Sequence, residues 1–418
     1  MDVKIQTIRG TKDLFGEEQA SFDHIVSTAQ KIASQYGFDH MTTPIIEFSD
    51  VFNRSLGETS DVVNKEMYSF QDRGGENITL RPEFTAAVCR AFISNGLENQ
   101  IPLKLFSYGP IFRYERPQKG RQRQFHQLNF EVLGIASFRA DVEVIVLANH
   151  LLRALGIEAK VELNINSLGC HKSRTAYRTA LVEYLTKFYK DLSEDSKVRF
   201  EKNPMRILDS KDENDQKILE SAPLIDDYYT IEARSFYDGV LQSLSDKGIK
   251  YFKNPKIVRG LDYYTHTAFE FVTTELGAQG TVIAGGRYDN LIKNLGGRDT
   301  TGVGCAPGIE RLMMLLDSRP KPAKSIVIIP NSTDQYGYAS GLADILRYNN
   351  FTVQFDLEEN IDSSKRMKRA LAKNAAFAIF VGESEVQNDS ITIRDLSNRE
   401  QTQIKNSELI DYLENIVR

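Results

Sequence analysis

Residues 111–134 limit the possible folds of this chain more than any other stretch does. Apolar and polar side chains alternate on both flanks of the segment, as they do in half-buried strands. Between the flanks, Pro117 and Gly120 are residues of the kind that a turn needs. The segment therefore predicts an antiparallel hairpin with a long loop over residues 113–123.

The predicted loop carries a charge that the rest of the chain does not share. It holds five cations against the single carboxylate of Glu115, a local charge of +4 in a chain of net charge −5. Phe125 and His126 follow on the second flank, and fixed cations beside rings suit a nucleotide or a nucleic-acid strand. A solvated hairpin tip is the competing interpretation. The five cations are Arg113, Arg116, Lys119, Arg121 and Arg123.

The same segment resembles motif 2 of the class II aminoacyl-tRNA synthetases. A Phe-Arg-x-Glu run at residues 112–115, the basic loop and an Arg-x-Phe-x-Gln run at residues 123–127 follow the order of that motif. The sequence at residues 121–127, followed by Glu131, is similar to the histidyl members of the class. The resemblance implies an α+β catalytic domain built on an antiparallel sheet.

The resemblance also implies roles for the hairpin residues. Arg113 is expected to contact the α-phosphate of ATP, Glu115 to contact adenine, and Phe125 to stack on the adenine ring. Arg121 is expected at the ATP phosphates. The loop residues expected at the acceptor end of tRNA are Arg116, Gln118, Lys119 and Arg123.

Length and composition fit a globular protein of more than one domain. A chain of 418 residues has room for two or three cores. No apolar run approaches the roughly 20 residues of a membrane span, and the N-terminus lacks the apolar core of a signal peptide. The three cysteines lie far apart, which disfavours a zinc site or a disulfide framework and fits a reducing cytosol. We therefore expect a cytoplasmic protein without a membrane partner.

The first third of the chain contains a helix pattern and a hairpin pattern. Residues 17–36 have helical spacing, Gly37 stands where a C-cap would be, and the next stretch contains Pro44, as edge strands do. This order resembles motif 1, which forms the dimer interface of class II synthetases, so a homodimer is expected. Residues 67–83 predict two strands around the turn at residues 73–75.

A Leu-Arg-Pro-Glu-x-Thr run follows at residues 80–85. Glu83 can be an acid at a helix N-terminus, where the helix dipole favours negative charge, and that interpretation stays open. The histidyl enzymes carry the same run, and in them the Glu and Thr bind the α-amino group of the substrate. The resemblance therefore implies that Glu83 and Thr85 bind histidine.

Residues 168–229 differ in character from the sequence on either side. They are rich in charge, helical in pattern and without strand patterns, so we interpret them as an inserted helical module. The module resembles the insertion of bacterial-type histidyl enzymes, which leans over the acceptor end of the tRNA. The catalytic domain that contains it is expected to span residues 1–318.

Three runs after the insertion resemble histidyl-specific sequences and motif 3. They lie at residues 259–264, 284–288 and 302–312, and their glycines allow a backbone to approach a ligand closely. None matches a full Walker or Rossmann pattern. By resemblance, Arg311 packs on adenine opposite Phe125 and contacts the γ-phosphate.

The expected chemistry joins an amino-acid carboxylate to the α-phosphate of ATP and expels pyrophosphate. Several anionic oxygens meet in this step, so the site needs fixed cations and Mg²⁺ rather than a strong base. By resemblance Arg259 reaches the α-phosphate opposite Arg113, and these two are the expected catalytic residues. Tyr264 and Glu131 suit an imidazole, one at each ring nitrogen. The remaining residues of the expected histidine pocket are Gln127, Tyr263 and Tyr288.

The C-terminal part predicts a separate small domain. Residues 319–324 have the composition of a linker, and the apolar run at residues 325–330 is typical of a buried parallel strand. Helix and strand patterns alternate after it, so we expect an α/β domain over residues 325–418. The resemblance implies that this domain binds the anticodon. A basic helix at residues 363–373 is either a solvated face or a contact to the RNA backbone.

Three functions fit these residues. The first is an ATP-dependent ligase of the histidyl-tRNA synthetase family, with histidine, ATP and tRNA(His) as partners. The alternative is the synthetase-like regulatory subunit of ATP phosphoribosyltransferase, which typically lacks the Arg at position 259 and the anticodon-binding domain. The third is a class II synthetase for another amino acid, which Glu131 and the run at residues 261–264 disfavour. Arg259 and the C-terminal domain favour the ligase.

Overall fold

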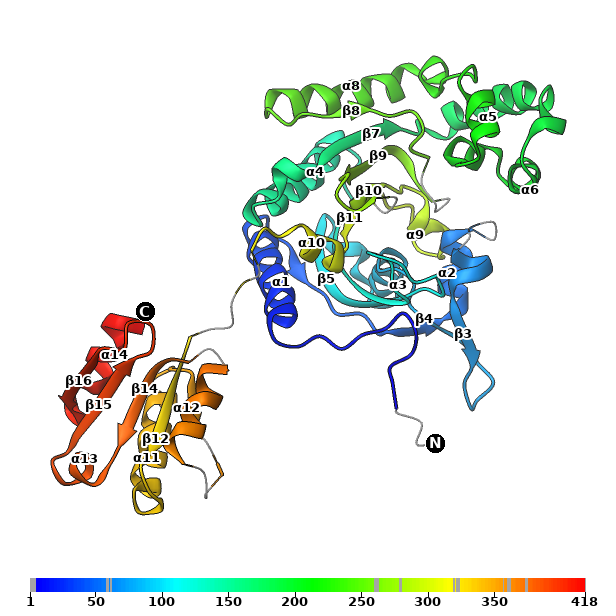
Figure 1. Ribbon diagram of the computed structural model, residues 1–418. Helices are drawn as coiled ribbons and strands as arrows, with labels where there is room; N and C mark the ends of the chain where they lie inside the picture. The colour runs from blue at the N-terminus through cyan, green and yellow to red at the C-terminus, as the bar shows by residue number, and fades with distance from the viewer. Residues whose placement is uncertain are drawn as a thin grey trace. The chain divides into compact units, whose positions relative to one another are not determined.

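The computed structural model forms two compact units, Met1–Arg319 and Pro320–Arg418 (Figure 1). It describes residues 5–57, 60, 62–258, 263–277, 280–318, 320, 324–355, 357–358, 362–372 and 375–417. The expected linker at residues 319–324 lies mostly outside this range. Among the described residues, no helix is long and apolar enough to cross a bilayer.

The first unit is built on an eight-stranded sheet of order β1-β5-β6-β11-β10-β9-β7-β8. The two outermost pairs, β1–β5 and β7–β8, are parallel and all other neighbours are antiparallel, so the predicted α+β architecture is confirmed. The strands are β1 (Asp39–His40), β5 (Leu103–Phe112), β6 (Gln124–Leu133), β7 (Glu162–Ser167), β8 (Phe252–Lys253), β9 (Thr265–Val272), β10 (Thr281–Arg287) and β11 (Gly302–Pro307).

The predicted hairpin forms the middle of this sheet. Strands β5 and β6 pair from Leu103 opposite Leu133 to Phe112 opposite Gln124. Because side chains alternate across a sheet, Phe130 and its even-numbered neighbours enter one core while Glu131 lies on the other face. The hairpin therefore separates a face whose middle is apolar from the face that carries the polar residues of the expected site.

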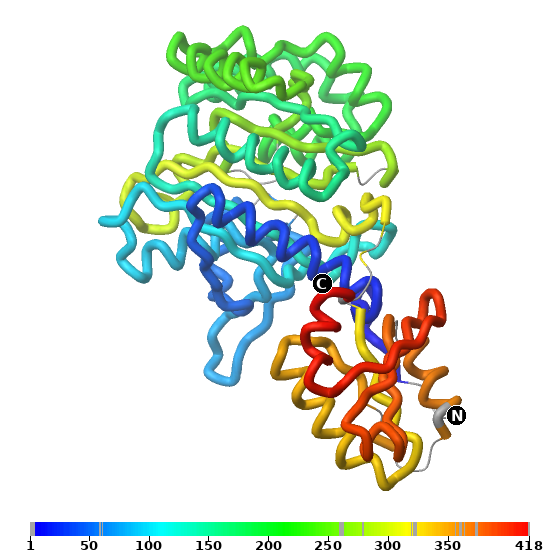
Figure 2. The backbone as a smooth tube through the Cα atoms, turned by 90° about the vertical axis from the view of Figure 1, so that its left-hand side faces the viewer, coloured from blue at the N-terminus to red at the C-terminus, as the bar shows by residue number. Residues whose placement is uncertain are grey.

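Helices cover both faces of the sheet. On the Phe130 face lie α1 (Glu17–Gln35), α4 (Phe138–Ala154), α8 (Ile231–Asp246) and α10 (Ile309–Leu315), and Figure 2 shows α1 running alongside the strands. On the other face lie α2 (Ser49–Leu56), α3 (Thr85–Ser94) and α9 (Leu291–Asn294). Helix α1 ends at a left-handed glycine, Gly37 at φ +72°, as its sequence predicts.

A small second sheet of order β2-β4-β3 adjoins the first, and its β3–β4 hairpin projects from the unit in Figures 1 and 2. Its strands are β2 (Ile46–Phe48), β3 (Tyr68–Gln71) and β4 (Asn77–Leu80), which confirms the two strands predicted around residues 73–75. Phe48 and Phe70 both face Ile78 in the register and are about half exposed, at 58% and 49%. The outer face of this sheet is therefore apolar and uncovered in the single chain.

Residues 168–229 contain no strand and build a core of their own. Their helices are α5 (His171–Thr186), α6 (Glu194–Lys202) and α7 (Glu213–Leu219), with short 3₁₀ turns between them. Leu181, Ile207 and Ile225 are buried together inside this group. The helix that follows, α8, packs instead on the main sheet beside α4.

The second unit is an α/β domain, as predicted. Its sheet has the order β13-β12-β14-β15-β16, parallel across the first three strands and antiparallel across the rest. Its strands are β12 (Ser325–Pro330), β13 (Val353–Phe355), β14 (Ala375–Val381), β15 (Ser390–Asp395) and β16 (Gln401–Lys405). Its helices are α11 (Tyr336–Tyr348), α12 (Ser363–Ala372), α13 (Glu383–Gln387) and α14 (Leu409–Val417).

The interpretation of the basic helix as a solvated face is wrong at one position. Arg366 of α12 is only 5% exposed, and its guanidinium donates to the Glu358 carbonyl at 2.8 Å. Arg369 forms an ion pair with the Glu358 carboxylate at 2.7 Å. Burial of its stem lets an arginine fix a neighbouring loop, and sequence alone does not distinguish that position from an exposed one.

Candidate active site

A pocket of about 950 Å³, its open mouth included, lies on the Glu131 side of the main sheet. Strand β6, the loop before it, the start of α3 and the start of α10 all contribute to its wall. The predicted residues that line this pocket are Glu83, Thr85, Arg113, Glu115, Arg121, Phe125, Gln127, Tyr263, Tyr264 and Arg311. Residues from four distant parts of the sequence thus meet in one place.

Glu131 is fully buried next to this pocket and accepts three hydrogen bonds. Thr85 Oγ1 donates to its carboxylate at 2.6 Å, Asn129 Nδ2 donates at 2.8 Å, and the hydroxyl of Tyr288 donates to the second oxygen. Burial raises the pKa of Glu131 from its ordinary 4.5 to about 7, and the hydrogen bonds oppose that rise. The predicted residues Glu131 and Tyr288 therefore support the pocket from one layer below its wall.

Two glycines make room for this pair. Gly304 stands opposite Glu131 in the β6–β11 register, and a Cβ there would lie 1.7 Å from Glu131 Oε2. A Cβ at Gly302 would lie 2.2 Å from the Tyr288 ring. The glycines at 302 and 304 were expected to let the backbone approach a ligand, and here they admit site side chains instead.

Glu83 occupies the N-terminus of α3. Its carboxylate accepts the backbone N–H groups of Thr85 at 2.7 Å and Ala86 at 2.6 Å, so the helix-acid interpretation of this residue is confirmed. Burial raises the pKa of Glu83, while these bonds and the charge of Arg113 lower it. Because Thr85 binds Glu83 through its backbone and Glu131 through its hydroxyl, it joins the two acids. Glu83 also lines the pocket, and the two interpretations are compatible.

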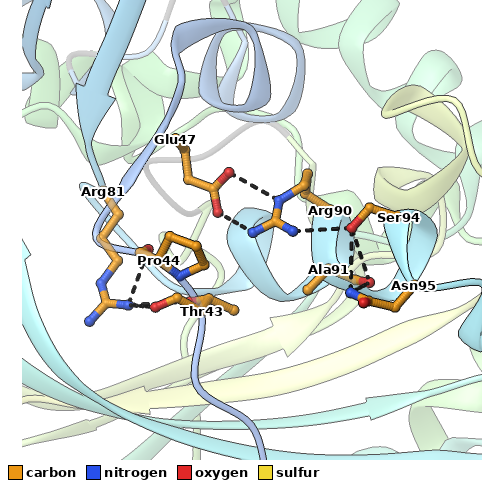
Figure 3. A network of polar contacts seen from close by, with 8 residues as sticks. All are labelled: Thr43, Pro44, Glu47, Arg81, Arg90, Ala91, Ser94 and Asn95. Atoms are coloured by element: carbon orange, nitrogen blue, oxygen red, sulfur yellow. Dashed lines mark hydrogen bonds and ion pairs between the residues drawn. The ribbon is translucent and has the colours of Figure 1, made fainter.

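The buried Arg81 fixes the segment before α3, and the partly exposed Arg90 fixes α3 itself (Figure 3). Arg81 donates to the Thr43 carbonyl at 2.9 Å and to the Pro110 carbonyl at 2.9 Å, and its guanidinium lies 4.1 Å from the Phe84 ring centroid. Burial lowers the pKa of Arg81 to about 10, so it stays charged at neutral pH. Arg90 of α3 pairs with Glu47 of β2. These contacts join the pocket segment to the extended chain that resembles motif 1.

Two of the pocket cations are held by backbone carbonyls. Arg113 Nε donates to the Pro82 carbonyl at 2.8 Å, and its guanidinium lies 5.6 Å from the centroid of the Phe125 ring. Arg311 donates to the carbonyls of Gly120 at 3.0 Å and Thr281 at 2.5 Å. A carbonyl orients a guanidinium without adding a negative charge beside it.

The remaining loop residues divide into two groups. Arg121 pairs with Glu115, and this hydrogen bond raises the pKa of Arg121. Arg123 is built into the base of the loop, where its Nε donates to the Glu115 carbonyl at 3.2 Å and its guanidinium lies 4.0 Å from the Tyr114 ring centroid. The three residues exposed at the loop tip are Arg116, Gln118 and Lys119.

Arg259, predicted as a catalytic residue, lies outside the described residues. Sequence reasoning also missed Glu310, which lines the pocket and accepts the backbone N–H of His126 at 2.9 Å and faces its Nδ1 at 2.8 Å. The sequence signal that could have identified Glu310 is its position directly before Arg311, a predicted ATP-binding residue. Across the described ranges, no three His, Cys, Asp or Glu side chains group as metal ligands.

Comparisons with known proteins agree with this geometry. A family model described as histidyl-tRNA synthetase matches residues 10–312, and one described as anticodon binding domain matches residues 325–416. A histidine–tRNA ligase of Wolbachia pipientis (strain wPip) is 51% identical over 98% of this chain and 99% of that protein. One of Rickettsia akari is 48% identical over 96% of each. The crystal structure of apo S. aureus histidyl-tRNA synthetase has a TM-score of 0.81 and 33% identity, covering 98% of this chain and 99% of that one.

The raised pKa of Glu131 predicts a pH-dependent stability. Below pH 4.5 the carboxyl is protonated in both states. Between pH 4.5 and about 7 the unfolded chain ionises it while the folded protein keeps the proton, so stability falls until the folded group ionises as well. The unfolding free energy of the wild type should therefore fall relative to that of Glu131→Gln between pH 5 and pH 8, by up to about 3 kcal/mol.

Urea unfolding at both pH values measures this difference. Glu162→Gln, at an exposed glutamate of β7, is the matched control and should follow the wild type. A constant difference between the wild type and Glu131→Gln across this range would contradict the assignment of the raised pKa.

Proposed function

The chain belongs to the histidyl-tRNA synthetase family, and on this premise we propose that it is a histidine–tRNA ligase. It activates histidine with ATP to histidyl-adenylate and pyrophosphate, and transfers histidine to the 3′-terminal adenosine of its tRNA. The observation that carries this proposal is a pocket whose wall holds Tyr264 at one end and fixed arginines at the other, with the buried Glu131 bonded to the wall residue Thr85. The end of the pocket with Tyr264 suits an imidazole, and the end with the arginines suits a nucleotide.

The inner end of the pocket has groups for the ammonium group and the imidazole of histidine. Gln127 Oε1 is buried and accepts no hydrogen bond from the described residues, so it can receive the substrate ammonium group. Glu83 supplies a second acceptor there. Tyr264 and Tyr263 lie in the wall, and Tyr264 can bond one imidazole nitrogen. Glu131 and Tyr288 act from the layer below, where Glu131 is bonded to the wall residue Thr85 and Tyr288 packs on Tyr263.

The outer end suits ATP. Arg113, Arg121 and Arg311 supply positive charge for the phosphates, and Phe125 supplies a flat apolar surface for adenine. Mg²⁺ binds nucleotide phosphates with only one or two protein carboxylates, and Glu310 at the pocket wall fits that need. The bound ion would supply neutralising charge, while the arginines orient the phosphates.

Two further features support the ligase over the regulatory-subunit alternative. The second unit matches an anticodon-binding domain, which that subunit typically lacks, and the reported curated relatives are named as ligases. The three cysteines are unpaired, which supports a reducing compartment such as the cytoplasm.

Histidine-dependent pyrophosphate exchange tests the function and the role of Arg259 together. The wild type should exchange pyrophosphate with histidine and with no other of the twenty amino acids. Arg259→His should lower kcat about 10²–10³-fold, because it removes one preorganised cation from the charged transition state. The KM values for histidine and ATP should change little.

Arg178→His, at an exposed arginine of α5, is the control and should exchange normally. Exchange with a different amino acid would refute the proposed function. Normal exchange by Arg259→His would refute its catalytic role alone.

We also propose a homodimer that covers the outer face of the small sheet. Ile46, Phe48 and Phe70 are about half exposed there, and contiguous exposed apolar surface marks protein contacts. Phe48→Asp with Phe70→Asp should shift the chain from dimer to monomer in sedimentation velocity. Phe252→Asp, at an equally exposed phenylalanine of β8, should remain dimeric. A dimer that survives the double substitution would place the interface elsewhere.

Because the chain forms two compact units, we expect adenylate formation and tRNA binding to be separable. A chain ending at Ser318 keeps the whole first sheet and every pocket residue, so it should retain histidine-dependent exchange. Its aminoacylation should weaken mainly through a higher KM for tRNA. Loss of exchange from a truncated chain that folds and dimerises normally would show that the second unit also serves adenylate formation.

A further inference from the structure

One side chain of the inserted module reaches the backbone of the amino-acid pocket. Arg174 lies in the first turn of α5, and its Nη1 donates to the carbonyl oxygen of Tyr264 at 2.8 Å. Tyr264 lines the pocket, whereas Arg174 does not. The module is therefore joined to the pocket through a residue that has no place in the pocket wall.

The root of the module fixes the position of Arg174. The neighbouring Ser173 is fully buried and accepts the backbone N–H of Thr230 at 3.0 Å, which joins the two chain crossings of the module. Tyr229 closes the same junction by donating its hydroxyl to the Ser167 carbonyl at 2.7 Å. Gly169 has φ +64°, and a Cβ there would lie 2.6 Å from Ser173 Cβ. The first turn of α5 is thus packed closely against the chain that follows β7.

The chain around Tyr264 is attached to this same root. The β7–β9 pairing ends at Ser167 opposite Thr267, and two more backbone bonds continue past it. Leu168 N donates to the His266 carbonyl at 2.6 Å, and His266 N donates to the Gly169 carbonyl at 3.0 Å. His266 has φ +44°, a conformation that costs free energy for a residue with a Cβ and persists only where its surroundings impose it.

The strained turn carries the two tyrosines of the pocket. The rings of Tyr263 and Tyr264 lie 4.6 Å apart, and Tyr263 packs on Tyr288 at 5.7 Å. A displacement of the Tyr264 peptide therefore moves both rings. Arg174 holds this peptide on the side of the module, and the root bonds hold it from His266.

We propose that Arg174 is a positioning residue that sets the affinity of the pocket for its amino acid. The inference rests on the proposed function, in which Tyr264 bonds an imidazole nitrogen. A guanidinium-to-carbonyl bond is charge-assisted and directional, so its loss lets the Tyr264 peptide shift. The ATP end is held by different contacts, from Arg113 and Arg311 to carbonyls outside this turn, and stays in place. The inserted module then contributes to amino-acid binding through Arg174.

The test compares three substitutions in the full-length protein by pyrophosphate exchange. Arg174→Met keeps the length of the side chain and removes the donor, and should raise the KM for histidine about tenfold. Its kcat and its KM for ATP should stay within about threefold of the wild type, a split that general loss of structure would not produce. Arg174→Lys keeps one cationic donor, so its KM for histidine should lie between those of the wild type and Arg174→Met. Arg178→Met, one turn along the exposed side of α5, should match the wild type.

A histidine KM for Arg174→Met equal to that of Arg178→Met would overturn the proposal, as would equal losses for histidine and ATP. If Arg174→Met does not fold, Arg174→Lys decides: a selectively raised histidine KM supports the proposal, and a wild-type KM overturns it. Absence of histidine-dependent exchange in the wild type would refute the proposed function instead. The same comparison would then be made with the amino acid that does support exchange.

Discussion

The buried carboxylate of Glu131 is the interaction on which the rest of the site depends. A carboxylate inside an apolar sheet is costly unless donors surround it, and here they come from α3, from β6 itself and from the end of β10. Each donor can reach Glu131 only if its own element is in place. The position opposite must also be Gly304, because any side chain there would occupy the space of the carboxylate. One charge therefore requires the correct pairing of three separate segments.

A second buried charge fixes the direction from which Tyr288 approaches Glu131. Its neighbour Arg287 is fully buried and pairs with Asp141 of α4 and with Asp289, while it also donates to the backbone carbonyls of Ile135 at 3.1 Å and Ser137 at 3.2 Å. Removing one partner of such a pair leaves an unpaired buried charge, which costs about 3–5 kcal/mol. The end of β10 is thus anchored to the helix layer on one side of the sheet while Tyr288 serves the pocket on the other.

Sequence reasoning succeeded where the information was local or carried by the family resemblance. The alternation on both sides of the basic loop was enough to predict the β5–β6 hairpin, and motif order brought Glu83, Phe125 and Arg311 to one pocket. It did not predict that Gly302 and Gly304 make room for side chains, because that depends on cross-strand register. It also misread Arg366, since a helical pattern of cations does not reveal which one is covered by a neighbouring loop. The roles of Gly302, Gly304 and Arg366 each depend on a contact with another segment of the chain, which local sequence patterns do not contain.

The arginines of the site are oriented in two ways, by backbone carbonyl oxygens or by a carboxylate. Arg113 and Arg311 are oriented by carbonyl oxygens, whereas Arg121 is paired with the Glu115 carboxylate, whose charge also acts on Arg311. Arg81, one layer away, is bound by carbonyls and by the Phe84 ring, and burial lowers its pKa only to about 10. A site for phosphates needs fixed positive charge before its ligand arrives, since preorganised charges cost no rearrangement during the reaction. Neutral backbone acceptors contribute to that need because they orient a guanidinium without adding a negative charge.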